Sequence, residues 1–413
     1  MKEKLLVIGG GASGLMAAVI AARRGYSVTV LEKMPRPARK MMITGKGRCN
    51  VTNDCGVDTL VSSTVANGRF LYSAFSSFSP TDTKSFFENA GVPLKTERGN
   101  RVFPVSDKAV DIVDALVNEA KANGVKILTE TVVSVLTEDG TAVGAECESN
   151  NTYYADAVII STGGCSYPLT GSTGDGHRFA KALGHTVTEL CPSLVPLVIR
   201  DEWCASLQGL SLKNVSVSFY EQGVKKPVYT DFGELMFTHF GVSGPTVLSA
   251  SAHLRKHRGI GYRMEIDMKP ALDDATLDKR LQREFSDNIN KDIINSLDAL
   301  LPKRLIPVII DKSGVPRNIK CNSVSKAQRD ALVRTLKHLS AETCGFRPIE
   351  EAVVTAGGVK TSEIDPSTMQ SKLIKRLYFT GEVIDVDAYT GGFNLQIAFS
   401  TGHLAGSKVF SEE

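Results

Sequence analysis

Residues 5–32 read LLVIGGGASGLMAAVIAARRGYSVTVLE, and this stretch decides the fold of the chain. The apolar run at 5–8 predicts a buried parallel strand, and a helix is expected from Ala12 to Arg24. Three glycines separate the two at the spacing of a dinucleotide-binding fingerprint: Gly9, Gly11 and Gly14. A second strand over 27–31 and the acidic residue Glu32 complete the unit. The stretch therefore predicts a site for a dinucleotide cofactor.

Each part of this unit has a physical use. Gly9 permits the tight turn, Gly11 lets a pyrophosphate approach the backbone, and Gly14 lets the helix pack closely on the strand. Ala12 and Ser13 open the helix, whose N-terminus points at the phosphates. The carboxylate of Glu32 suits ribose hydroxyls and repels a 2′-phosphate, so FAD or NAD is favoured over NADP as the resident cofactor.

The composition limits the classes of protein to which the chain can belong. The chain has 413 residues, 42% of them hydrophobic, and a net charge of +3, so we expect two or three domains and no nucleic-acid arm. The first strand begins within a few residues of Met1, and no apolar stretch approaches the length of a membrane span. Eight cysteines show neither CxxC pairs nor metal-ligand spacing. We expect a cytoplasmic protein with reduced thiols, no metal site and no membrane partner; its oligomeric state stays open.

The pattern of elements predicts a discontinuous domain with insertions. Strand and helix signals over 125–160 indicate a strand at 125–129, a small antiparallel meander and then a buried strand at 157–161. We expect the strand at 125–129 to belong with the meander. The predicted helices are 81–90, 107–123, 177–183 and 246–256, with a last helix ending near 410. The predicted domains are a cofactor domain at 1–190 and 350–413, a β-rich insert at 191–271 and 340–349, and a helical subdomain at 272–339.

Four segments together resemble one family of FAD flavoproteins, the BaiN-type and aminoacetone oxidase-like enzymes. They are GGGASGLMAA, ITGKGRCNVTN, STGGCSYPLTGSTGDG and GEVIDVDAYTGGFNLQIAFSTGHLAG, and the insert segment GELMFTHFGVSGP is a fifth. The resemblance covers nearly the full length. It implies an α/β architecture with a Rossmann-type, glutathione-reductase-like FAD domain, a β-barrel-like insert and a small helical subdomain, with FAD as cofactor. This chain has Gly45-Lys46-Gly47 where the family usually carries several glycines.

The same segments suggest further cofactor-binding residues. Gly47 allows the backbone to approach a flat ring, while Arg48 and Asn50 offer donors. Gly391 and Gly392 open the final helix, whose N-terminus is predicted to face the flavin and stabilise its negative charge when reduced. The resemblance implies that Glu382 holds the ribityl chain, where relatives commonly have Asp. The remaining predicted cofactor-binding residues are Lys33, Lys40, Cys49, Val133, Thr162, Gly163, Gly381, Phe393, Asn394 and Leu395.

The sequence gives weaker evidence for a functional role of several other residues. His239, in the glycine-rich FTHFGVSGP segment, is the candidate catalytic proton donor, with a structural role as the favoured alternative. Cys49 is a candidate redox thiol without a CxxC partner, so a packed thiol is favoured. Arg101 and Tyr389 are possible polar groups of the pocket, and Trp203 is expected in the core of the insert.

Three functions fit these observations. Since only one dinucleotide fingerprint is present, NAD(P)H must bind transiently as a co-substrate. The first function is NAD(P)H-driven reduction of an activated carbon–carbon double bond, for which the resemblance implies a 3-oxo Δ4 or Δ4,6 bile-acid steroid as a candidate substrate. The second is an aminoacetone-type amine oxidase that uses O₂. The third, an RNA-associated flavoprotein, is disfavoured by the near-neutral charge and the lack of an aromatic and basic stripe, so we expect a small-molecule substrate.

Overall fold

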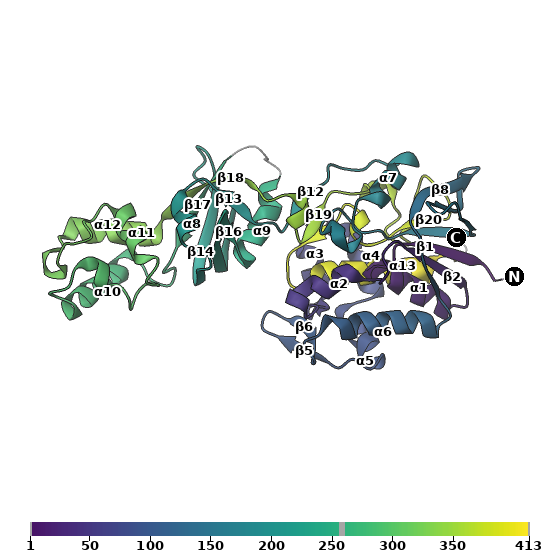
Figure 1. Cartoon of the computed structure of the whole chain (residues 1–413), viewed down its shortest axis with the longest axis horizontal. Helices are drawn as coiled ribbons and strands as arrows, with labels where there is room; N and C mark the ends of the chain where they lie inside the picture. The colour runs from purple at the N-terminus through teal and green to yellow at the C-terminus, as the bar shows by residue number, and fades with distance from the viewer. Residues whose placement is uncertain (1, 256–260, 412–413) are drawn as a thin grey trace. The chain divides into compact units, whose positions relative to one another are not determined.

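The computed structural model describes residues 2–255 and 261–411. The chain divides into two compact units: unit 1 comprises Met1–Ser193 and Ile349–Glu413, and unit 2 comprises Leu194–Pro348 (Figure 1). Lys256, the predicted last residue of a helix, lies outside the described residues. Among the described residues, no helix is both long and apolar enough to cross a membrane.

A five-stranded parallel sheet forms the centre of unit 1, with the strand order β20-β11-β1-β2-β7. Its strands are β1 (Lys4–Ile8), β2 (Ser27–Glu32), β7 (Lys126–Thr129), β11 (Ala157–Ile160) and β20 (Leu377–Phe379). The predicted Rossmann-type fold is therefore confirmed. One expectation was wrong: the strand at 125–129 pairs in parallel with β2 rather than with the meander. The true meander consists of β8 (Val132–Glu138), β9 (Thr141–Cys147) and β10 (Thr152–Tyr154).

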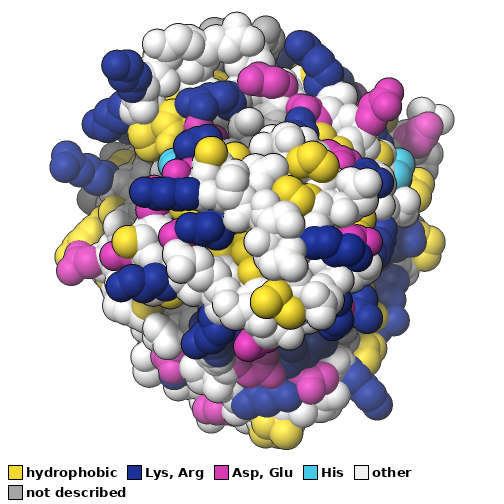
Figure 2. Space-filling model, turned by 90° about the vertical axis from the view of Figure 1, so that its left-hand side faces the viewer, with side chains coloured by type: hydrophobic (Ala, Val, Ile, Leu, Met, Phe, Trp, Pro, Cys, Tyr) yellow, Lys and Arg dark blue, Asp and Glu magenta, His cyan; other side chains and the backbone are white. Residues whose placement is uncertain are grey.

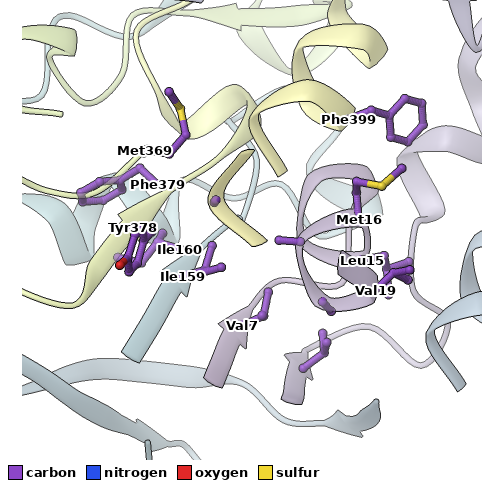
Figure 3. Close-up of a cluster of buried hydrophobic side chains, with 14 of the residues drawn as sticks. Val7, Leu15, Met16, Val19, Ile159, Ile160, Met369, Tyr378, Phe379 and Phe399 are labelled. Atoms are coloured by element: carbon purple, nitrogen blue, oxygen red, sulfur yellow. The ribbon is translucent and has the colours of Figure 1, made fainter. Parts of the chain in front are cut away.

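The helices α1 (Ala12–Arg23) and α13 (Phe393–Lys408) pack against each other beside this sheet (Figure 1). Small residues allow the close approach, because a Cβ at Gly402 would lie 2.2 Å from the carbonyl oxygen of Ser13. Figure 3 shows Leu15, Met16 and Val19 of α1 in the apolar core that also contains Phe399 of α13. The core thus joins the first and last helices of the chain and fixes the C-terminal segment beside the fingerprint.

A second small sheet of unit 1 has the order β3-β6-β5, with β3 (Thr52–Asn53), β5 (Leu94–Glu97) and β6 (Arg101–Pro104). The other elements of unit 1 connect these layers. Its further helices are α2 (Arg39–Ile43), α3 (Val57–Ser62), α4 (Tyr72–Ser77), α5 (Pro80–Asn89), α6 (Ala109–Ala122) and α7 (Asp175–Ala182). Its remaining strands are β4 (Thr64–Ala66), β12 (Cys191–Ser193), β19 (Val354–Ala356) and β21 (Asp387–Ala388).

Unit 2 contains a closed six-stranded barrel with the order β13-β16-β15-β14-β17-β18. Its strands are β13 (Leu197–Ile199), β14 (Ser211–Glu221), β15 (Tyr229–Thr238), β16 (Gly241–Ser243), β17 (Tyr262–Asp267) and β18 (Leu339–Phe346). The alternation of buried and exposed residues along β14 is that of a strand with one face on a core. The helices of unit 2 are α8 (Glu202–Ser206), α9 (Pro245–Leu254), α10 (Asp274–Asp287), α11 (Ile306–Ser313) and α12 (Lys326–Lys337). The predicted barrel-like insert is therefore confirmed.

Candidate functional site

A cavity of unit 1 lies at the carboxyl ends of the five parallel strands. Residues that end or follow each strand line it: Ile8 and Gly9 after β1, Leu31 and Glu32 of β2, Glu130 to Val132 after β7, Ser161 to Gly163 after β11, and Glu382 after β20. Open α/β sheets bind their ligands in this crevice, so the cavity lies where a dinucleotide is expected.

Two of the fingerprint glycines, Gly9 and Gly11, line this cavity. Gly9 has a φ of +101°, and a Cβ there would lie 2.6 Å from the carbonyl oxygen of Ser161. A Cβ at Gly14 would lie 2.0 Å from the carbonyl oxygen of Gly9, so α1 packs tightly on the turn. Around Gly11 the nearest such protein atom is 4.0 Å away, so a side chain there would project into open space. The first backbone amides of α1 come directly after Gly11 in the chain, and they have no hydrogen-bond partner within the helix. This cradle fits a pyrophosphate group.

Glu32 lies at one end of the cavity, held by two backbone amides. Its Oε2 accepts from the amide of Gly10 at 2.7 Å, and its Oε1 accepts from the amide of Met34 at 2.8 Å. Burial raises the pKa of Glu32, and these two hydrogen bonds oppose that effect. Each carboxylate oxygen keeps a further lone pair, so a ribose hydroxyl still finds an acceptor.

An ion pair joins two of the segments that line the same region. Lys33 Nζ donates to Asp175 Oδ2 at 2.7 Å and also to Thr173, which in turn donates to Asp175. Arg178 of α7 donates to the carbonyl oxygen of Val133 at 3.0 Å. Although burial opposes ionisation of Asp175, the hydrogen bonds from Lys33 and Thr173 lower its pKa. The start of α7 is thus tied to the residue after β2 and to the meander.

A second ion pair lies in the cavity wall. Lys40 Nζ donates to Glu382 Oε2 at 2.7 Å and to Ser166 Oγ at 2.6 Å. Glu382 Oε1 accepts from Ser166 at 3.1 Å and from the amide of Thr355 at 2.7 Å. Burial would raise the pKa of Glu382, but the charge of Lys40 and these hydrogen bonds outweigh it and hold the pKa below its usual value. The site therefore contains a fixed cation and anion within one hydrogen-bonded cluster.

The N-terminus of α13 is braced by polar side chains. Asn394 accepts from the amide of Ala388 at 3.0 Å and donates to the carbonyl oxygens of Ala388 and Tyr389. Asn53 donates to the carbonyl oxygen of Gly391 at 3.0 Å. Asn394 and the following Leu395 line the cavity. The first turn of α13 therefore lies at the cavity wall, with its positive dipole end fixed in place.

The loop 44–50 lies partly outside the cavity. Thr44 lines it, but Arg48 pairs with Glu97 and Asp107 and lies over the ring of Phe103, 4.0 Å from the ring centroid. Cys49 is buried, and burial raises its pKa to about 12, so it is a protonated thiol at neutral pH. Asn50 has a buried Oδ1 without a protein partner, and an acceptor of this kind is available to a ligand.

The predicted cofactor residues fall into two groups. Twelve line the cavity: Gly9, Gly11, Ala12, Ser13, Glu32, Lys33, Lys40, Thr162, Gly163, Glu382, Asn394 and Leu395. Ten do not: Gly14, Gly47, Arg48, Cys49, Asn50, Val133, Gly381, Gly391, Gly392 and Phe393. Cavity residues without a prediction include Thr44, Glu130, Thr131, Val132, Gly171, Ser172 and Asp175. Those at 130–132 follow β7, and recognition of that segment as a strand of the parallel sheet would have pointed to them.

The remaining candidates lie elsewhere. His239 is an exposed residue of unit 2 whose ring contacts that of Phe240, and Trp203 packs edge-on against Phe237 at the core of the same unit. Arg101, on β6, donates to the carbonyl oxygen of Arg98. No role of these residues in the reaction follows from their positions, and the role of His239 stays a prediction.

Comparison with known proteins gives relatives that match over nearly the whole chain. The 3-dehydro-bile acid Δ(4,6)-reductase of Clostridium scindens is 31% identical over 98% of both chains. The ribosomal RNA dihydrouridine synthase of Escherichia coli is 30% identical over 96% of this chain and 95% of its own. The solved structure of 3-ketosteroid-Δ4-(5α)-dehydrogenase from Rhodococcus jostii shares the fold, with a TM-score of 0.52 at 15% identity, over 100% of this chain and 97% of its own.

The fold and the cavity together define a Rossmann-type FAD-binding oxidoreductase. Within that class, the chain belongs to the family described as HI0933-like protein Rossmann domain, whose model matches residues 3–408. The predicted family resemblance and the FAD cofactor are thereby confirmed. Ribosomal RNA dihydrouridine synthases of Escherichia coli and Haemophilus influenzae are among the relatives, so the absence of a nucleic-acid partner stays a prediction.

Proposed function

We propose that this protein reduces a carbon–carbon double bond conjugated to a carbonyl group, with a reduced nicotinamide nucleotide as the hydride donor. The observation that carries the proposal is the full-length similarity to two reductive enzymes of different names. A Δ4,6 3-oxo steroid and a uracil ring look unrelated, but in both the reducible bond is conjugated to a carbonyl. One flavin-dependent reaction therefore accounts for both activities.

The groups of the cavity suit this chemistry. When bound, FAD supplies the hydride transfer to the β-carbon, and a proton added at the α-carbon completes a net gain of two hydrogens. Lys40, held by Glu382 and Ser166, provides a fixed cation in a partly buried wall, and the N-terminus of α13 provides a positive dipole end. Because Glu382 neutralises Lys40, it is the dipole end of α13 that favours negative charge within the cavity. His239 stays the candidate proton donor.

Two acceptors follow from the relatives. The first is a 3-oxo Δ4 or Δ4,6 bile-acid steroid, supported by the similarity to the Clostridium scindens reductase. The second is a uridine within RNA, supported by similarity of almost the same strength to the dihydrouridine synthases. An amine oxidase that uses O₂ is the alternative reaction.

The test is a mass measurement on the acceptor. FAD-loaded protein is incubated without oxygen with NADH or NADPH, and with either a 3-oxo Δ4 steroid or a uridine-containing RNA. We expect one acceptor to gain two hydrogens. If neither gains hydrogens, and an aminoketone instead yields peroxide in air, the protein is an oxidase and the proposal fails.

A further inference from the structure

The amide side chain of Gln396, in α13, is the centre of a hydrogen-bonded cluster in the interior of unit 1. Its Oε1 accepts from the hydroxyl of Thr52 at 2.5 Å and from that of Thr83 at 2.9 Å. Its Nε2 donates at 2.9 Å both to the carbonyl oxygen of Phe78 and to Ser400 Oγ. Every hydrogen-bonding position of the amide is therefore filled within the protein. We call this cluster the Gln396 network.

Polar groups at the surface need no such arrangement. Figure 2 shows one face of the molecule, on which Lys and Arg side chains are spread with Asp and Glu side chains among them. Water can satisfy exposed groups of this kind, whereas a polar group buried without a partner costs free energy. In the Gln396 network, Thr52, Thr83, Gln396 and Ser400 are all 0% exposed. Their hydrogen bonds with one another therefore hold β3 and α5 in one arrangement against α13.

The strand β3 contacts the start of α13 at further points. Asn53 Nδ2 donates at 3.0 Å to the carbonyl oxygen of Gly391, two residues before the helix begins. A Cβ at Gly392 would collide with the backbone of Thr52, so the strand and the start of the helix are in close contact. The hydroxyl of Thr52 reaches Gln396, at the end of the first turn. Two consecutive residues of β3 therefore hold α13 on both sides of its first residue.

The turn that β3 holds belongs to the cavity wall. Asn394 and Leu395 line the cavity, and Gln396 is the next residue. The amide of Gln396 donates to the carbonyl oxygen of Gly392, the residue before the helix. The amides of the three residues between them have no partner within the helix, and among the described residues no side chain caps them. Their positive dipole end is therefore available to a negatively charged group in the cavity.

We infer that Thr52 is a positioning residue for FAD: through Gln396 it fixes the free amides of α13, and so sets how strongly the protein stabilises the cofactor in its reduced state. The inference rests on the proposed function, in which the dipole end of α13 favours negative charge within the cavity. Reduction adds negative charge to the flavin, so displacement of these amides weakens the binding of reduced FAD more than that of oxidised FAD. The midpoint potential of the bound FAD reports the ratio of these two affinities, and it should therefore depend on Thr52.

The test is the midpoint potential of the bound FAD, measured without oxygen against reference dyes, in the wild type and in Thr52→Val. Valine keeps the shape of threonine and lacks its hydroxyl group. We expect reduced FAD to lose about tenfold more affinity than oxidised FAD, which lowers the two-electron potential by about 30 mV. Thr52→Ser restores the hydroxyl group and should return the potential toward that of the wild type.

Thr83→Val is the matched control. The hydroxyl of Thr83 donates to the same oxygen of Gln396, but it comes from α5 rather than from the strand that contacts the start of α13. We expect this variant to lose as much stability in urea denaturation as Thr52→Val and to keep the wild-type potential. If Thr52→Val does not retain FAD, Asn53→Ala takes its place, because it removes the contact of β3 with Gly391 and should lower the potential in the same way.

Two results would overturn the inference. One is an unchanged potential in a Thr52→Val protein that retains FAD, since a purely structural role weakens the binding of oxidised and reduced FAD alike. The other is an equal shift of the potential in Thr83→Val. Failure of the proposed function is read separately, as the absence of hydrogen gain in any acceptor, because the potential is measured without an acceptor.

Discussion

The ammonium group of Lys40 lies 2.7 Å from Oε2 of Glu382, although 342 positions separate the two residues in the chain. Lys40 follows β2 and Glu382 follows β20, the strand at one edge of the parallel sheet. Their side chains are 23% and 18% exposed, so the pair is largely removed from water. It connects the first and last parts of the cofactor domain within the cavity wall.

Lys40→Met should therefore destabilise the protein strongly. It leaves the buried carboxylate of Glu382 without its counter-charge, and we expect the free energy of unfolding to fall by about 3 kcal/mol in urea denaturation. Arg36→Met is the matched control, because its pair with Asp114 is about half exposed and should contribute less than about 1 kcal/mol. Equal losses in the two variants would show that the Lys40–Glu382 pair has no special role.

Substitutions at two fingerprint glycines should have different effects, one on FAD binding and the other on folding. Gly11→Val places a Cβ whose nearest contact is the backbone oxygen of Ser161 at 4.0 Å, so the protein should fold with stability within about 1 kcal/mol of the wild type and lose most of its FAD. Gly14→Val places its Cβ against the carbonyl oxygen of Gly9 and should prevent folding. Flavin absorbance and circular dichroism measure the two effects. Retention of FAD by Gly11→Val would contradict the assignment of the cavity.

Burial of His177 should make stability depend on pH. Burial lowers the pKa of this histidine, with Glu382 opposing the effect, so the folded state keeps it neutral at pH values where the unfolded chain becomes protonated. The unfolded state then binds more protons, and stability falls as the pH drops below about 6.5, by at most about 1.4 kcal/mol per pH unit.

His177→Gln should reduce this slope, measured by urea denaturation from about pH 7.5 to about pH 5.5. His239→Gln removes an exposed histidine of unit 2 and is the control. If both variants kept the slope of the wild type, the acid sensitivity would have another origin.

The ion pair between Lys33 and Asp175 should slow the loss of FAD. Lys33→Met removes the link between the residue after β2 and the start of α7, and we expect FAD to dissociate about fivefold faster, which corresponds to about 1 kcal/mol. Raising the salt concentration should speed dissociation from the wild type more than from the variant, because the pair is partly exposed. An identical salt dependence would show that the pair does not restrain the cofactor.

The local parts of the site could be predicted from the sequence. Gly9, Gly11 and Glu32 belong to one strand–helix–strand unit, in which short-range geometry fixes every position. The pairing of strands could not be predicted in this way: the segment at 125–129 precedes the meander strands in the chain, yet β7 joins β2. Strand partners depend on the whole fold, and the residues at 130–132 that line the cavity were missed for the same reason.

The ion pairs of Arg48 show the same limit for side chains. Glu97 and Asp107, from later segments, hold its guanidinium group, which its place in the loop 44–50 did not indicate, and its contact with the cofactor stays a prediction.

The most direct measurement is anaerobic stopped-flow absorbance of the bound flavin, first mixed with NADH or NADPH and then with an acceptor or with oxygen. The account predicts rapid bleaching by a nicotinamide nucleotide, slow return of colour with oxygen, and fast return with an acceptor whose double bond is conjugated to a carbonyl, in a steroid or in RNA. Bleaching by an amine but by neither nucleotide, followed by fast reoxidation with oxygen, would contradict it.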